Sequence, residues 1–334
     1  MSNRDAVGKR YMSDNAIFAD AFNFLIYGGK PVIKPEELRE ADTAELAIPG
    51  GSLPAVQKCR DAKKVWAAKR DSRAVYVLLG GELQDKVHYA MPVKDMFYDV
   101  IDYAGQVDEV RRSYRKKTDD GEFTVEDGTL KVKLTSEEFL SGFRKTDKLM
   151  PVITATIYFG ANDWDGPLSI HDMLDVDDEA LLNVIPNYFV NLLAPARIDD
   201  ADFEKFGTDL GIAMKVLKYQ DRDKIGQVFR SLNHRKVGRL TAEFLNVQAN
   251  LGLKFEEPPE EGEIDMCKGM ELFIRKERAD ENVKATEKAT KEATESTLLQ
   301  NIRKMMKNLN MTVAQAFAAL EVPASDQARL AALL

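Results

Sequence analysis

The chain has few of the residues that hold small stapled folds together. Among its 334 residues are only two cysteines, Cys59 and Cys267, and three histidines. This scarcity excludes a disulfide scaffold and argues against a structural zinc site. No apolar run is long enough to cross a membrane. The first fifteen residues contain no apolar segment of the kind that marks a secretory signal, so we expect a cytoplasmic protein.

A surplus of positive charge is also missing, because 55 acidic residues outnumber 47 basic ones and give a net charge of −8. This balance argues against a protein that coats nucleic acid through bulk positive charge. Basic side chains are nevertheless concentrated in residues 58–73, where we expect Lys63, Lys64 and Arg70 to contact DNA phosphates. The alternative is that they are ordinary solvated surface residues.

Residues 59–84 have the pattern of a β-hairpin. The polar turn 69–73 separates two runs, and the second run, residues 74–79, is rich in β-branched and aromatic side chains. A hairpin folded about residues 71–72 places Asp61 directly across from Glu82, and directly opposed residues point to the same face. Gln84 lies two residues further on and shares that face. Two carboxylates and an amide at one end of a sheet are, in outline, a site for a divalent metal ion.

The remaining patterns predict a mixed α/β sheet with flanking helices. A helix opens at Ser13 or Asp14, and Gly28-Gly29 ends it. A second helix begins near Pro92, and its expected buried face carries Val93, Phe97, Val100, Ala104 and Val107. Strands are expected at 43–48, in both arms of the hairpin, at 151–159 and at 187–193. The second helix suits a crossover to a parallel strand, which leaves the hairpin at the sheet edge.

The C-terminal part of the chain is expected to be helical. We divide the chain into a core at 1–200, a helical region at 201–279 and a tail at 280–334, which begins with a polar low-complexity tract. The tail then regains an apolar stripe, and Thr312 and Gln315 have the spacing of a capping box. So small a unit is not expected to bury its apolar side chains alone, and we therefore predict that it mediates self-association. The alternative is that it packs on the core of its own chain.

A family resemblance is centred on the segment LLGGELQDKVHYAMPVKDMFYDVIDY. Its matching elements are the strand end with Glu82 and Gln84, and the helix start with Met91, Pro92, Lys94 and Tyr98. Further matches are Asp14 and Phe18, Arg60-Asp61, and residues 151–174 and 301–323. On these residues the chain resembles the recombination-promoting nuclease (Rpn) family, also called YhgA-like transposases.

The resemblance implies a PD-(D/E)XK nuclease fold and a Mg²⁺-dependent DNA endonuclease that promotes recombination. It implies that Asp61 and Glu82 bind the metal, with the Leu83 carbonyl as a third ligand, and that Gln84 orients the attacking water. Such an ion prefers oxygen ligands, lowers the pKa of a bound water and stabilises charge on the phosphodiester. Lys94 is expected to contact DNA, although the family pattern has arginine at this position.

Several residues near this motif allow a second interpretation. Asp14 can reach a metal-bound water or simply cap its helix, and His88 can contact phosphate or be an ordinary loop histidine. Tyr98 is expected close to the site. Gly80-Gly81 can form a bulge and shift the strand register by one residue. The rival hypothesis is a catalytically weak, nuclease-like scaffold that acts as a protein- or DNA-interaction module through its helical tail.

Overall fold

The computed structural model describes residues 3–41, 44–47, 56–70, 73–114, 134–220, 227–228, 231, 236–251 and 263–334. The chain divides into two compact units, Met1–Met270 and Glu271–Leu334. Within the described ranges, no helix is both long and apolar enough to cross a membrane.

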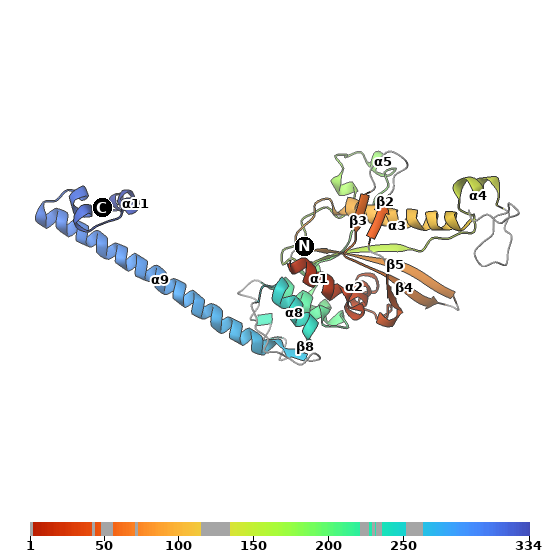
Figure 1. Ribbon diagram of the computed structural model, residues 1–334, viewed down its shortest axis with the longest axis horizontal. Helices are drawn as coiled ribbons and strands as arrows, with labels where there is room; N and C mark the ends of the chain where they lie inside the picture. Colours follow the sequence, from red (N-terminus) through yellow and green to blue (C-terminus); the bar gives the residue numbers. More distant parts are fainter. Residues whose placement is uncertain are drawn as a thin grey trace. The chain divides into compact units, whose positions relative to one another are not determined.

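Unit 1 is built on a five-stranded mixed sheet with the order β1-β4-β5-β6-β7 (Figure 1). The strands are β1 (Leu38–Glu40), β4 (Ala62–Arg70), β5 (Arg73–Gln84), β6 (Val152–Tyr158) and β7 (Asn191–Leu193). β1, β4 and β5 are antiparallel neighbours, whereas β5, β6 and β7 are parallel. The predicted mixed α/β sheet is therefore confirmed, and β7 is shorter than the predicted strand.

The β4–β5 hairpin has the predicted register. Its ladder runs without interruption from Arg70 opposite Arg73 to Ala62 opposite Gly81, and the turn at 71–72 lies outside the described residues. Gly80 and Gly81 therefore form no bulge. The prediction that the hairpin is the sheet edge is wrong, because β1 pairs with β4 and covers it.

Two small ladders lie outside the main sheet. The extended segment predicted at 43–48 forms β2 (Ala44–Ala47), which pairs with β3 (Val56–Cys59) rather than with the main sheet. The other ladder pairs β8 (Lys236–Gly238) with β9 (Glu263–Asp265). The third antiparallel strand of the main sheet is therefore β1, a strand of only three residues that the sequence pattern did not predict.

Helices cover both faces of the sheet. α1 (Asn3–Ser13) and α2 (Asn15–Tyr27) lie on one face, and α3 (Met91–Tyr114) lies on the other (Figure 1). α2 has the predicted limits, since Asp14 caps its first turn and Gly28, at φ 61°, ends it in the left-handed conformation that glycine adopts readily. α3 connects the parallel strands β5 and β6, as predicted.

The predicted buried face of α3 is wrong. Val93 and Val100 are 44% and 56% exposed, while Asp95 and Asp99 from the opposite side of the helix are buried. The physical reason is the buried Arg60, between β3 and β4, which provides opposite charge to that side of α3. The buried face of α3 is therefore an acidic stripe.

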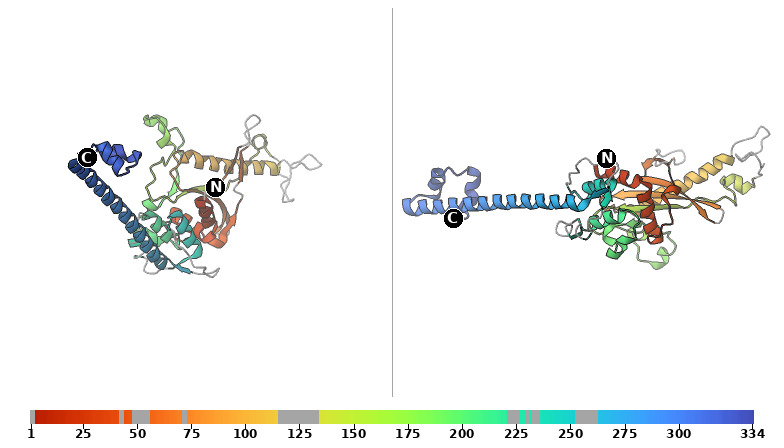
Figure 2. Two further views of the ribbon diagram at one scale, coloured as in Figure 1. Left: turned by 60° about the vertical axis from the view of Figure 1, so that its left-hand side comes forward. Right: turned by 90° about the horizontal axis from the view of Figure 1, so that it is seen from below.

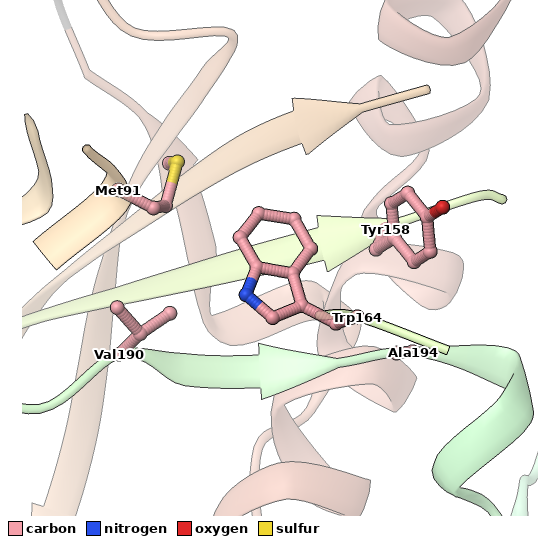
Figure 3. Close-up of a cluster of buried hydrophobic side chains, with 5 residues drawn as sticks. All are labelled: Met91, Tyr158, Trp164, Val190 and Ala194. Carbon is pink, nitrogen blue, oxygen red and sulfur yellow. The ribbon is translucent and has the colours of Figure 1, made fainter. Parts of the chain in front are cut away.

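Other helices complete unit 1. They are α4 (Ser136–Ser141), α5 (Glu179–Leu182), α6 (Leu210–Lys218) and α8 (Arg239–Gln248). α8 packs on α1, where Phe244 stacks on Tyr11 with ring centroids 4.0 Å apart. On the α3 side, Trp164 lies between Met91, Tyr158 and Val190 (Figure 3). Met91 is the first residue of α3, so this cluster fixes the start of α3 against the sheet.

Unit 2 contains most of α9 (Met266–Leu309) together with α10 (Val313–Ala319) and α11 (Ala324–Ala331), which pack near the end of α9 (Figure 2). Thr312 and Gln315 form the predicted capping box. The expectation that the tail cannot bury its apolar residues alone is wrong, because Ile302, Phe317 and Leu330 are buried in a cluster of its own. Self-association of the tail stays a prediction, but it is no longer supported by an inability of the tail to bury its own apolar side chains.

Candidate active site

Asp61 stands at a bend between β3 and β4, one residue before the hairpin ladder. Its Oδ2 accepts a hydrogen bond from the backbone amide of Leu83 at 3.0 Å. Its Oδ1 lies 2.8 Å from the Nζ of Lys9, which belongs to α1. The bend therefore holds the Asp61 carboxylate against the backbone of β5, next to a lysine from the first helix.

Glu82 follows directly after the last ladder pair and is only 1% exposed. Its Oε2 lies 2.7 Å from the Nζ of Lys94, in the first turn of α3. Its Oε1 is buried and has no hydrogen-bond partner among the described residues. Burial raises the pKa of Glu82 to about 7; the charge of Lys94 opposes this shift, and the nearby carboxylates of Asp61 and Asp95 add to it. A buried acid with one free oxygen is thus present at the sheet end.

The two lysines approach from opposite layers, because Asp61 bonds Lys9 of α1 and Glu82 bonds Lys94 of α3. The prediction that Asp61 pairs directly with Glu82 on one face of the sheet is therefore wrong, since the β4–β5 ladder ends at Ala62 and Gly81 and Asp61 bends toward α1. Side chains alternate along β5, so that Glu82 points toward α3 and its neighbour Leu83 points toward Gly8 of α1. The candidate site therefore lies at the end of the sheet, with α1 on one side and α3 on the other (Figure 1). A cleft of about 330 Å³ opens on the α1 side, and Arg4, Lys9, Asp61, Leu83 and Asp85 are among its lining residues. Asp61 can therefore be reached from this cleft.

A third acid, Asp95, lies on the α3 side of the site. It is fully buried, and its Oδ2 accepts a hydrogen bond from the Thr156 hydroxyl at 2.8 Å. Thr156 pairs in register with Glu82 on the neighbouring strand. Sequence reasoning missed Asp95 because it weighed only the apolar residues of α3. The signal was available, since Asp95, Asp99 and Asp102 recur at helical spacing.

Arg60 supports this arrangement from beneath α3. Its buried guanidinium bonds Asp99 at 3.2 Å, Asp102 at 2.9 Å and the Thr154 hydroxyl. It also lies over the ring of Tyr98, 4.9 Å from the ring centroid. Tyr98 is therefore buried against Arg60, and the contact shown for it is with this guanidinium rather than with Asp61 or Glu82.

The prediction that Lys63 and Lys64 contact DNA is wrong for this arrangement of the chain. Lys63 is buried and bonds Asp102 at 2.5 Å. Lys64 is 1% exposed and donates to the Ser13 carbonyl at 2.7 Å, to Asn15 Oδ1 at 2.6 Å and to Glu40. Burying an ammonium group requires such partners, so these lysines hold the sheet to α1, α2 and α3 rather than face solvent. The side chain of Arg70 lies outside the described part of the structure.

The remaining predicted residues are less closely engaged. Asp14 caps α2 through bonds from the Ala16 and Ile17 amides at 2.8 and 3.1 Å, which agrees with the capping interpretation. His88 is exposed in the loop before α3. Gln84, the last residue of β5, is half-buried.

No protein-family model, curated protein or solved structure matches this chain. Among the residues that the structure describes, no group of three or more His, Cys, Asp or Glu side chains is placed to hold a metal ion. A cation at this site would therefore rely on two carboxylates and on hydroxyl, carbonyl or water oxygens. Mg²⁺ is commonly bound in that way.

Proposed function

We propose that this chain is a Mg²⁺-dependent DNA endonuclease of the PD-(D/E)XK type that hydrolyses phosphodiester bonds and thereby promotes recombination. The observation that carries the proposal is Glu82, a buried carboxylate with one oxygen free, at the strand end beside Asp61. An ionised acid in such a position is costly unless a cation or a proton joins it. Structural carboxylates normally have all their oxygens bonded, as Asp99 illustrates in this chain.

The order of the elements supports the fold assignment. A helical N-terminus, the antiparallel strands β1, β4 and β5, the helix α3 and the parallel strand β6 follow one another along the chain. The resemblance to the nuclease family implies the same succession. It also implies acids at the facing ends of β4 and β5; Asp61 lies one residue before β4, and Glu82 comes directly after the last residue of β5 that pairs with β4.

The residues at the sheet end fit a small divalent cation. Glu82 offers its free Oε1, and each oxygen of Asp61 keeps a second lone pair beside its bond to Lys9 or to the Leu83 amide. The Leu83 carbonyl is the third ligand that the family resemblance implies. When bound, Mg²⁺ supplies a water of lowered pKa and neutralises charge that develops on the phosphate.

The chain's own residues supply positive charge and orientation. Strand position 84 carries glutamine where such sites usually have lysine, but Lys9 brings an ammonium group to Asp61 and Lys94 brings one to Glu82. Once the acids hold a cation, we expect these lysines to contact the scissile phosphate and stabilise its transition-state charge. Gln84 orients the water but cannot accept its proton, which passes to bulk water or to a phosphate oxygen.

The proposal is tested with the full-length protein on a labelled DNA duplex in Mg²⁺. Glu82→Gln and Asp61→Asn should each lower the cleavage rate by about 100-fold or more, because each removes a charged ligand. Asp108→Asn changes an exposed acid on α3 and serves as the matched control. Products with 5′-phosphate ends are expected. If Glu82→Gln cleaves as fast as Asp108→Asn, the site is not where the chemistry occurs.

One observation favours the rival, a nuclease-like scaffold without activity. Lys9 already pairs with Asp61 and Lys94 with Glu82, so ion pairs within the chain already balance the charges of the two acids. For a scaffold we expect no cleavage by the wild type with Mg²⁺ or Mn²⁺, and none after Lys9→Ala. Cleavage by the wild type decides against the scaffold.

A further inference from the structure

Asp95 is an acid that the strand-end motif does not include. It lies in the first turns of α3, is 0% exposed and points toward the sheet. One of its oxygens bonds the Thr156 hydroxyl at 2.8 Å. Its other oxygen, Oδ1, is buried and has no partner in the described part of the chain.

Glu82 shares this environment through two independent connections. Glu82 and Thr156 are register partners on adjacent parallel strands, so their side chains leave the sheet on the same face, about 5 Å apart at the backbone. Lys94, the chain neighbour of Asp95, bonds the other oxygen of Glu82. Two buried acids, each with one free oxygen, are therefore connected to Thr156, Asp95 through its hydroxyl and Glu82 as its register partner.

The cations nearby are already committed. Lys94 bonds Glu82, and Arg60 bonds Asp99 and Asp102 one turn further along α3. When both acids are ionised, their two negative charges face a single bonded ammonium group, that of Lys94. Low-dielectric surroundings make such an excess unfavourable unless a further positive charge joins it.

We propose that Asp95 and Glu82, together with the Thr156 hydroxyl, bind a hard divalent cation of the Mg²⁺ or Mn²⁺ class. This inference rests on the proposed function, because it assigns an additional ligand to the same site. Carboxylate and hydroxyl oxygens suit such ions, which keep several waters and need few protein ligands. Asp95 and Thr156 then add oxygen ligands to that site from the α3 side.

Cation binding is measured on the full-length protein without DNA. Mn²⁺ is titrated into metal-free protein and its free concentration is followed by electron paramagnetic resonance, while melting in EDTA checks the fold. The variants are Asp95→Asn, which retains an acceptor for Thr156, and Asp108→Asn as the control on the same helix. Wild type and Asp108→Asn should bind Mn²⁺ alike, and Asp95→Asn should bind it roughly tenfold more weakly or worse.

The assignment is overturned if Asp95→Asn binds Mn²⁺ as tightly as the wild type. It is also overturned if the wild type binds no Mn²⁺, in which case the two acids share a proton instead. If Asp95→Asn does not melt cooperatively, Asp95→Cys decides the question. Its thiolate should shift the preference from Mn²⁺ toward the softer Cd²⁺, and an unchanged preference counts against a ligand role. A wild type that binds Mn²⁺ through Asp95 but cuts no DNA refutes the proposed nuclease alone.

Discussion

Gly80→Ala tests whether the buried charges beneath α3 hold the site together. Gly80 faces α3, and the Arg60 guanidinium lies directly over it. A Cβ at this position would overlap Nη1 of Arg60 and lie 2.9 Å from its Cζ. Arg60 cannot move aside without leaving Asp99 and Asp102, since its side chain is enclosed on all sides. The absent side chain of Gly80 is therefore a requirement of the ion pairs.

The expected loss follows from two opposing effects. Breaking a buried ion pair by removing one partner costs about 3–5 kcal/mol, and displacement of Arg60 approaches that value. Replacing a strand glycine by alanine recovers about 0.5–1 kcal/mol through the unfolded chain. We therefore expect Gly80→Ala to lower the free energy of unfolding by about 2–4 kcal/mol.

The neighbouring glycine provides a matched control. A Cβ on Gly81 would lie 3.6 Å from the Cβ of Ala62, an ordinary contact, so Gly81→Ala should stay within about 1 kcal/mol of wild type. Equilibrium unfolding in urea, followed by tryptophan fluorescence, measures both variants, since Trp66 and Trp164 are the only tryptophans and belong to unit 1. Equal stability of Gly80→Ala and Gly81→Ala would refute the reasoning about Arg60.

Three further predictions concern other parts of the chain. Lys64→Ala should lower the free energy of unfolding by about 3 kcal/mol, because it leaves the buried acceptors of the lysine unpaired. If Lys64 were solvated, the same substitution would change the free energy of unfolding very little. Urea unfolding distinguishes the two results. In EDTA, the free energy of unfolding of the wild type should fall as the pH rises from about 4.5 to about 7. Over this range the folded chain keeps protons on Glu82 and Asp95 that the unfolded chain releases. The free energy of unfolding should fall by up to about 1.4 kcal/mol per pH unit for each of the two groups. A Glu82→Gln variant whose free energy of unfolding falls as steeply with pH as that of the wild type would contradict this. Ile302→Ala should destabilise unit 2 by about 2–5 kcal/mol. Helical circular dichroism should then be lost at a lower urea concentration, while the tryptophan fluorescence transition of unit 1 stays unchanged. A shift of the tryptophan transition would contradict this prediction.

Local sequence patterns predict the parts of this fold that local physics decides. The polar turn and the β-branched run specify the hairpin and its register, and Asp14 and Gly28 specify where α2 begins and ends. The near-continuous apolar run at 151–159 predicts the buried strand β6. Each of these features depends on residues close together in the chain.

The site depends on contacts that no local pattern contains. Apolar periodicity places the wrong side of α3 against the sheet, because it assumes that a buried face is apolar. Here Arg60 makes an acidic face the favourable one to bury. Lys9 and Asp95 join the site from two helices on opposite layers, at distances along the chain that spacing rules do not cover. The same long-range pairing turns Lys64 from an expected DNA contact into part of the core.

The central claim is that the acids at the sheet end support metal-dependent cleavage of DNA. Nicking of supercoiled plasmid by the full-length wild type, with Glu82→Gln in parallel, tests it most directly. We predict conversion to open circles by the wild type in Mg²⁺, no conversion in EDTA, and no conversion by a folded Glu82→Gln variant. Plasmid left intact by the wild type in both Mg²⁺ and Mn²⁺, or nicked equally by both proteins, would contradict the claim.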